Sequence, residues 1–109
     1  MIKIGICDDE QQMRKTLRQI LEQVLQLRGT DHQISEYGSG EELTAGISYL
    51  DTDILFLDIE MKIMNGIAVK DKICMERLNS KIIFLTSHRD MAIESVGRNV
   101  YGFVPKDEM

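Results

Sequence analysis

The sequence predicts a single α/β domain built on a doubly wound, five-stranded parallel sheet. One observation is that short apolar segments alternate with segments of helical periodicity along the 109 residues, which is typical of a parallel sheet covered by helices. A second is that four apolar runs each end in polar or charged side chains: Asp8 with Asp9, Asp58, Thr86 and Lys106. The carboxyl ends of neighbouring parallel strands meet at one edge of a sheet, where open α/β folds bind their ligands. The pattern therefore predicts one polar site at that edge.

The first predicted strand and helix come from residues 2–7 and 10–27. The strand segment is largely apolar, and the helix segment carries apolar side chains at intervals of three and four residues. Gly29 follows the helix at a position where glycine commonly ends one.

The next pair of elements is predicted from a weaker pattern. Residues 33–37 alternate between Ile34 and Glu36 as an edge strand does. Residues 39–42 form a capping-box pattern for a helix that is predicted to run to about Leu50.

The second half of the chain continues the alternation. Residues 53–57 and 81–85 each continue from one charged residue into an uninterrupted apolar run, which is typical of central parallel strands, and the strand at 2–7 is predicted to lie centrally with them. Helices are predicted at 66–78 and 90–96, and a last strand at 101–104. Because Pro105 has no amide proton to donate, this last strand is expected at a sheet edge.

Composition restricts the function classes. The chain has a net charge of −5 and scattered basic residues, so direct binding of nucleic acid by this domain is not expected, whereas a metal cation or a basic partner is. Cys7 and Cys74 occur without a signal peptide or a long apolar span. We therefore expect reduced, buried thiols in a cytoplasmic protein that does not enter a membrane.

The predicted domain occupies residues 1–109. Only three residues follow Lys106, whereas a doubly wound sheet normally has a final helix over its last strand. We expect a domain that is truncated at its carboxyl end and separated from any output domain, with an uncovered apolar flank that favours dimerisation.

The acidic residues predict a metal site. Strand ends in adjacent strands lie about 5 Å apart, so Asp9 and Asp58 are predicted to share a cation, with Asp8 reaching it directly or through water. Oxygen ligands favour Mg²⁺ or Mn²⁺. Repulsion between the carboxylates is expected to raise at least one of their pKa values. The alternative for Asp8 and Asp9 is a simple role as caps of the helix that follows them.

Asp58 is the candidate nucleophile, because a carboxylate directly after four apolar residues must emerge at the strand exit or be paired. A carboxylate can accept a phosphoryl group as an aspartyl phosphate. Mg²⁺, the Lys106 ammonium and the Thr86 hydroxyl would then each neutralise one phosphoryl oxygen.

The polar residues at the strand ends and their neighbours together closely resemble the receiver domains of two-component response regulators, and the resemblance covers essentially the whole chain. The matching segments are Asp8-Asp9-Glu10, Asp58-Ile59-Glu60-Met61, Met64-Asn65-Gly66, Thr86-Ser87 and Lys106. Residues 56–61 and 86–88 are more similar to receivers of the LytTR class. The resemblance implies a flavodoxin-like sheet of order 2-1-3-4-5.

The resemblance also implies a phosphorylation-dependent switch. Asp58 would accept a phosphoryl group from a histidine kinase or from acetyl phosphate. Mg²⁺ would be held by Asp8, Asp9, Asp58 and the backbone carbonyl of Glu60.

The remaining implied roles concern transmission of the signal. Thr86 would move toward the phosphoryl group together with Phe103. The signal would leave through the fourth helix and last strand, which also form a possible dimer surface, to an output domain that acts on DNA. The exposed side of the first helix would help to dock the kinase.

Two departures from the family pattern affect the expected site. Lys62 stands where such receivers commonly have proline, and Pro105 precedes Lys106 instead of following it. A cis bond to Asp107 would cost about 2.5 to 4 kcal/mol, so this departure leaves the geometry of the turn and the placement of Lys106 open. Glu60 and His88 either affect the lifetime of the phosphoryl group or are exposed loop residues, and Met61 and Met64 are expected to pack the loop.

Three alternatives stay open at this stage. A flavodoxin-like binding module would need backbone amides that hold a phosphate, and no glycine-rich loop follows the first strand in the sequence. A phosphohydrolase would need a general acid or base beyond Glu60, so no enzyme with sustained turnover is predicted, only the domain's own phosphoryl transfer and autodephosphorylation. A phosphorylation-independent receiver that acts as a dimerisation or interaction module is the third.

Overall fold

A computed structural model of the chain describes residues 1–47, 50–87 and 97–109. Within this part, five parallel strands form one sheet in the order β2-β1-β3-β4-β5. The strands are β1 (Ile2–Cys7), β2 (His32–Tyr37), β3 (Ile54–Asp58), β4 (Lys81–Thr86) and β5 (Val100–Pro105). The helices are α1 (Gln11–Leu27), α2 (Gly40–Ala45) and α3 (Gly66–Met75), and a 3-10 helix, η3, spans Lys106–Glu108. The predicted fold class, strand order and central strands are confirmed.

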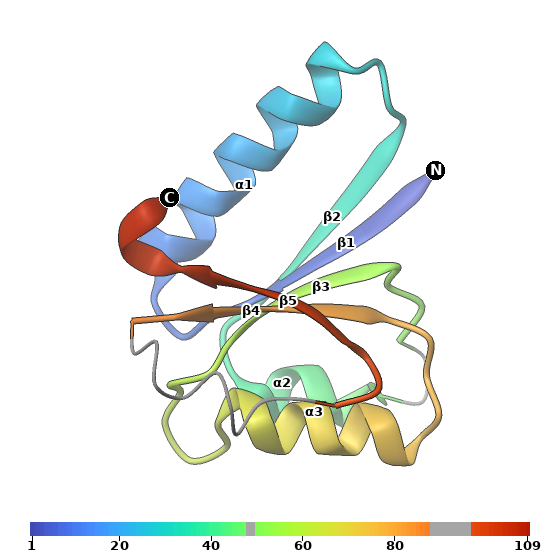
Figure 1. Cartoon of the computed structure of the whole chain (residues 1–109), viewed down its shortest axis with the longest axis vertical. Coiled ribbons are helices and arrows are strands. Elements are labelled where there is room, and N and C mark those ends of the chain that lie inside the picture. Colours follow the sequence, from blue (N-terminus) through green and yellow to red (C-terminus); the bar gives the residue numbers. More distant parts are fainter. Residues whose placement is uncertain (48–49, 88–96) are drawn as a thin grey trace.

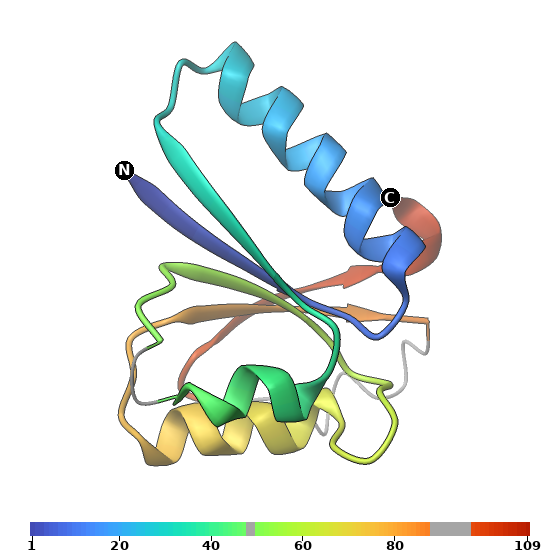
Figure 2. The same ribbon diagram turned by 180° about the vertical axis from the view of Figure 1, so that it is seen from behind.

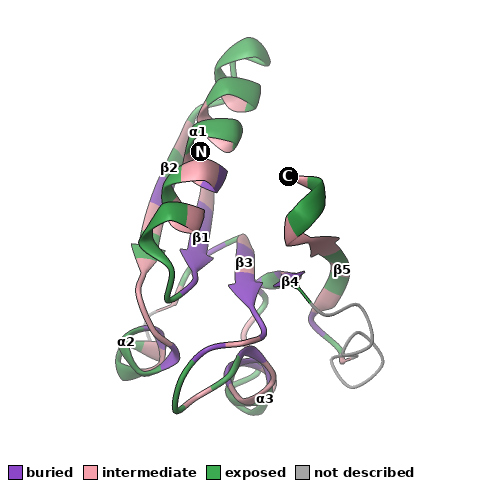
Figure 3. Cartoon of the chain, turned by 90° about the vertical axis from the view of Figure 1, so that its left-hand side faces the viewer, coloured by how far each residue is buried: buried purple, intermediate pink, exposed green. Residues whose placement is uncertain are grey.

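Helices lie on both faces of the sheet. Helix α1 lies over one face, and α2 and α3 lie together over the other, as Figure 1 and the view from behind in Figure 2 show. On the α2 and α3 side, strand residues such as Leu55, Leu57 and Phe84 pack against Val69 and Ile73. On the α1 side a smaller buried cluster forms around the helix residue Leu17, with members Ile4, Ile6, Ile34 and Leu85. Figure 3 shows the buried residues concentrated on the central strands β1 and β3.

The register of the sheet aligns the strand ends. Cys7 pairs with Leu57, so the residues that follow, Asp8 and Asp58, leave the sheet side by side. Thr86, at the end of β4, pairs with Pro105 at the end of β5. The polar residues predicted for the site therefore leave the sheet at one edge.

Two helices end earlier than predicted. Helix α2 stops at Ala45 instead of continuing to about Leu50, with Gly46 as its C-cap, because glycine is a poor helix former. Helix α3 stops at Met75 instead of Leu78. There Arg77 takes a positive φ of 55°, and the Leu78 amide returns to the Ile73 carbonyl, which reverses the chain as a glycine cap would.

The other boundaries agree within a residue or two. Helix α1 begins at Gln11, one residue later than predicted, and Gly29 follows it with a φ of 63°. Strands β2 and β5 are both at edges of the sheet, as predicted from the alternation at 33–37 and from Pro105. Both cysteines are free thiols, Cys7 buried and Cys74 half-buried.

Some predictions fall outside the described residues. The fourth helix, residues 90–96, and His88 belong to these. The possible dimer surface is thus described only in part, through β5, where Tyr101 is exposed, and dimerisation stays a prediction. Among the described residues, every helix is too short or too polar to cross a membrane.

Candidate functional site

Two carboxylates are buried at the carboxyl edge of the sheet. The side chains of Asp8 and Asp58 are 0% and 1% exposed. The Asp8 amide donates to the Tyr37 carbonyl of β2, which anchors the residue at the end of β1. Each carboxylate also accepts a backbone N–H two residues further along: Asp8 Oδ1 from Glu10 at 2.9 Å, and Asp58 Oδ1 from Glu60 at 3.2 Å. Burying two like charges this close is unfavourable unless a cation neutralises them.

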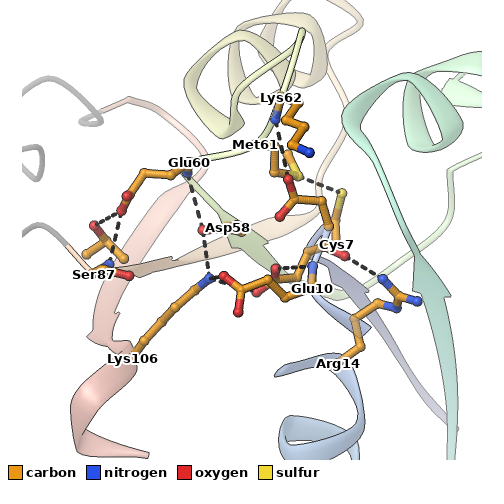
Figure 4. A network of polar contacts seen from close by, with 12 residues as sticks. Cys7, Glu10, Arg14, Asp58, Glu60, Met61, Lys62, Ser87 and Lys106 are labelled. Carbon is orange, nitrogen blue, oxygen red and sulfur yellow. Dashed lines mark hydrogen bonds and ion pairs between the residues drawn. The ribbon is translucent and has the colours of Figure 1, made fainter. Parts of the chain in front are cut away.

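Lys106 provides that positive charge. Its Nζ lies 3.1 Å from Asp8 Oδ2 and 3.2 Å from Asp58 Oδ1, and 3.6 Å from Glu10 Oε1. Figure 4 shows the Lys106 side chain extending from the start of η3 toward Asp58 and Glu10. The structure therefore brings together three of the predicted site residues, from β1, β3 and the end of β5.

The unusual order Pro105-Lys106-Asp107 leaves Lys106 at the site, where the sequence predicted it. The peptide bonds of the described residues are all trans. Pro105 is extended, with φ −64° and ψ 133°, and acts as the N-cap of η3. Because η3 turns the chain directly after the strand, the long Lys106 stem reaches back to the two carboxylates without a cis bond.

Desolvation is the largest single influence on the pKa values of Asp58 and Lys106. Burial, followed by repulsion from the Asp8 carboxylate, raises the pKa of the Asp58 carboxyl, Lys106 partly opposes both effects, and the net result is a pKa of about 7. Repulsion, the cause expected from the sequence, is thus the second contribution and burial the first. Burial alone would lower the pKa of Lys106, but the carboxylates of Asp58 and Asp8 outweigh this effect and raise it.

The acidic cluster fits a divalent cation. Carboxylate oxygens of Asp8, Asp9 and Glu10 all lie within 4.8 Å of one another. Asp58 Oδ2 is buried and has no hydrogen-bond partner among the described residues, which leaves an anionic oxygen available to a hard cation. Asp9 is exposed and accepts the Lys62 amide at 3.4 Å. Glu10 was not among the metal ligands predicted, although it directly follows the Asp-Asp pair.

A capping role for Asp8 and Asp9 is not observed. The N-cap of α1 is Glu10, and it makes no side-chain capping hydrogen bond. Asp8 Oδ1 instead accepts the Glu10 amide just before the helix begins. The Asp8 backbone carbonyl accepts from the Arg14 guanidinium at 2.7 Å, a contact that sequence reasoning missed.

Thr86 is buried at the end of β4, but its hydroxyl is directed to Glu60. Thr86 Oγ1 donates to Glu60 Oε1 at 3.3 Å, and the Ser87 amide donates to the same oxygen at 3.1 Å. Glu60 is therefore part of the site rather than a free loop residue. The structure does not place Thr86 on the Asp58 carboxylate.

The loop after β3 is held close to the site by its own residues. Met61 is buried and lies 3.8 Å from the Cys7 thiol, which confirms its predicted packing role. A Cβ at Gly66 would lie 2.3 Å from the Asp58 carbonyl oxygen, so only glycine allows this approach of α3. An open pocket of about 510 Å³ lies over the loop, lined by Asp9, Glu10, Glu60, Met61 and Lys62.

Phe103, the aromatic residue that the resemblance links to Thr86, lies on the neighbouring strand. Its ring stacks on Phe84 with centroids 5.7 Å apart. Phe103 is 36% exposed as a residue, so it sits between the core and solvent. Its predicted change of rotamer stays a prediction.

The fold and this arrangement of carboxylates and lysine agree with the sequence comparisons, which assign the chain to a class of signalling domain. The family model for the response regulator receiver domain matches residues 4–109. The chain therefore belongs to the response regulator receiver domain family. The narrower resemblance to the LytTR class stays a prediction, because this family model covers receiver domains as a whole.

Two curated relatives are regulatory proteins by name. The chain is 31% identical to the positive alginate biosynthesis regulatory protein of Pseudomonas aeruginosa, covering 96% of this chain and 41% of that protein. It is also 31% identical to the transcriptional regulatory protein LnrK of Bacillus subtilis, covering 98% of this chain and 48% of that protein. The chain thus spans less than half the length of these relatives.

A solved structure shares the fold. The response regulator TrrA of Thermotoga maritima, determined in complex with Mg²⁺ and BeF, is 28% identical, with a TM-score of 0.73. The alignment covers 96% of this chain and 86% of that one. The chain is a receiver domain of response-regulator type, and homologues of this kind are two-component transcriptional regulators.

Proposed function

We propose that Asp58 is the phosphoacceptor of this receiver domain, with Asp8, Asp9, Asp58 and the Glu60 backbone carbonyl holding Mg²⁺ or Mn²⁺. The observation that carries the proposal is the buried Asp58 carboxylate, which has Lys106 Nζ 3.2 Å from one oxygen and leaves the other without a hydrogen bond within the described part of the chain. This arrangement supports Asp58 as the nucleophile and Lys106 as its counter-ion.

Transfer of the phosphoryl group to Asp58 forms one bond to phosphorus and breaks another. An Asp58 carboxylate oxygen forms a bond to phosphorus while the P–N bond of a kinase phosphohistidine breaks, and the electron pair of that bond stays on the imidazole nitrogen. With acetyl phosphate, the P–O bond breaks and acetate leaves. A bound divalent cation would supply charge neutralisation for the phosphoryl oxygens.

Lys106 and Thr86 have separate roles in this proposal. Lys106 gives up part of its ion pairing with Asp8 and Asp58 and contacts a phosphoryl oxygen, because a lysine ammonium is a compact positive charge that binds phosphoryl oxygens well. Thr86 exchanges Glu60 for a phosphoryl oxygen. Both residues position the group and neutralise its charge, so the domain acts as a switch with its own slow phosphoryl chemistry and not as an enzyme with sustained turnover.

The partners follow from the same proposal. A histidine kinase supplies the phosphoryl group, and an output domain elsewhere in the protein receives the signal. Since LnrK is named as a transcriptional regulatory protein, and both of these relatives are more than twice as long as this chain, we propose that DNA is contacted by that output domain.

Intact mass after incubation with acetyl phosphate tests the proposal. We expect a single phosphoryl adduct that requires Mg²⁺ and is removed by hydroxylamine. Asp58→Asn abolishes it, whereas Asp51→Asn, which changes an exposed carboxylate at the other edge of the sheet, retains it. A wild-type protein that takes no adduct from acetyl phosphate or from a phosphorylated histidine kinase would contradict the phosphoacceptor role and favour a phosphorylation-independent interaction module.

A further inference from the structure

Glu60 connects the ends of two strands through its side chain. It lies in the loop after β3, and Oε1 accepts both the Thr86 hydroxyl at 3.3 Å and the Ser87 amide at 3.1 Å. Figure 4 shows the Glu60 side chain reaching across to Ser87, away from Lys106. One carboxylate oxygen thus accepts hydrogen bonds from two donors at the end of β4.

The same two donors lie next to the phosphoacceptor in the sheet. Asp58 pairs with Leu85, so Thr86 and Ser87 follow one and two residues after its partner. Thr86 is 2% exposed, which leaves its hydroxyl little access to water. A donor in this environment needs an acceptor in every state of the protein. In the unphosphorylated state that acceptor includes the Glu60 carboxylate.

A phosphoryl group on Asp58 would compete for these donors. It brings about −1.5 to −2 charges and three strong acceptor oxygens to the residue two positions before Glu60. A single hydroxyl proton cannot be donated fully to two anions. Repulsion between the phosphoryl group and the Glu60 carboxylate acts in the same direction as this competition.

We propose that the Glu60 carboxylate is an internal anionic ligand of the Thr86 hydroxyl and the Ser87 amide, which it releases when Asp58 is phosphorylated. The inference rests on the proposed phosphoacceptor role of Asp58. Glu60 stabilises the unphosphorylated arrangement and so sets how strongly a phosphoryl group must bind to switch the domain, because a ligand shifts a two-state equilibrium only by its difference in affinity for the two states.

A simpler explanation is that Glu60 only adds negative charge near the site. Glu10 separates the two explanations. It is also a glutamate near the buried carboxylates, but its carboxylate contacts Lys106, with Oε1 3.6 Å from Nζ, and lies on the β1 side of the site. A general charge effect would appear at Glu10 and Glu60 alike, whereas competition for the β4 donors would appear at Glu60 alone and depend on Thr86.

Beryllofluoride binding at saturating Mg²⁺ is the test, measured on chain 1–109 in two double-mutant cycles. One cycle combines Glu60→Gln with Thr86→Ala, and the other combines Glu10→Gln with Thr86→Ala. We expect Glu60→Gln to tighten beryllofluoride binding about tenfold when Thr86 is present and about threefold or less when it is alanine. Glu10→Gln should change binding by the same factor in both backgrounds.

A second readout needs no phosphoryl chemistry. In the unmodified protein, Glu60→Gln should shift the Ser87 amide resonance in ¹H–¹⁵N spectra, because a charged acceptor is replaced by a neutral one. In the wild type, beryllofluoride should shift the Ser87 amide resonance by more than Glu60→Gln does.

The outcomes separate the two proposals. The Glu60 inference alone would be overturned if wild-type protein binds beryllofluoride but the effect of Glu60→Gln on its affinity does not depend on Thr86. An effect of Glu60→Gln equal to that of Glu10→Gln would have the same meaning. Tighter binding of beryllofluoride by wild type than by Glu60→Gln would overturn it too. Wild-type protein that binds no beryllofluoride and takes no phosphoryl adduct would overturn the phosphoacceptor proposal, and the Glu60 inference with it.

Discussion

Two lysine–carboxylate clusters lie at opposite edges of the same sheet and differ mainly in burial. At the carboxyl edge, Lys106 is 10% exposed and pairs with Asp8 and Asp58, whose side chains are 0% and 1% exposed. At the amino edge, Lys3 is 39% exposed and pairs with Asp51, which is 71% exposed. The two clusters contain the same residue types at similar separations.

The same chemistry gives opposite responses in the two environments. At the amino edge, the hydrogen bond from Lys3 lowers the pKa of Asp51. At the carboxyl edge, burial raises the pKa of Asp58 to about 7, although Lys106 lies 3.2 Å away. Burial therefore decides whether a lysine–aspartate pair is a solvated surface contact or a site that retains unsatisfied charge for a ligand.

The largest expected effect comes from removing the buried cation. Lys106→Met leaves Asp8 and Asp58 without their counter-ion, and we expect the metal-free fold to lose about 2 to 4 kcal/mol of unfolding free energy. Urea denaturation at neutral pH measures it. A loss as small as that of a surface substitution would show that water, and not Lys106, compensates the two carboxylates.

Divalent cation binding should stabilise the fold next most strongly. At a Mg²⁺ concentration of about 100 times Kd, the free energy of unfolding is expected to rise by roughly 2.7 kcal/mol, followed as a shift in Tm. Asp8→Asn should remove most of this gain, and Asp51→Asn at the amino edge should retain it. An equal gain in both variants would place the cation away from the buried carboxylates.

The pH dependence of the metal-free protein should report Asp58. Because its pKa rises from the ordinary 3.8 to about 7 on folding, the folded chain holds a proton that the unfolded chain has released. This contribution is present at acid pH and is lost as the pH rises through about 7, by about 1 to 2 kcal/mol after allowance for screening. The free energy of unfolding, measured by denaturation between pH 5 and pH 8, should therefore depend less on pH in Asp58→Asn than in the wild type. An unchanged pH dependence in this variant would be inconsistent with the raised pKa.

The smallest effect is expected at the amino edge. Lys3→Met breaks an exposed pair that water and salt already screen, so we expect no measurable change in stability or in the phosphoryl adduct. The same denaturation and mass measurements check it. A loss comparable to that of Lys106→Met would mean that burial is not what separates the two clusters.

Much of the fold could be predicted because it depends on local patterns. The apolar runs at 53–57 and 81–85 predicted central strands, and Pro105 predicted an edge strand, since neither depends on distant contacts. The helix ends were predicted less well. Helix α3 stops at Met75 because Arg77 takes a positive φ, and no local residue pattern marked that conformation.

The amino-acid sequence by itself determined that Asp8, Asp58, Thr86 and Lys106 would reach one edge of the sheet, because parallel strands that end together bring their next residues together. Only the tertiary structure decided how these side chains are paired. Lys106 lies between Asp8 and Asp58 despite the altered proline position, and Thr86 donates to Glu60. Such pairings depend on burial and on distances of a few ångströms between segments far apart in the chain, which strand order and residue type do not specify.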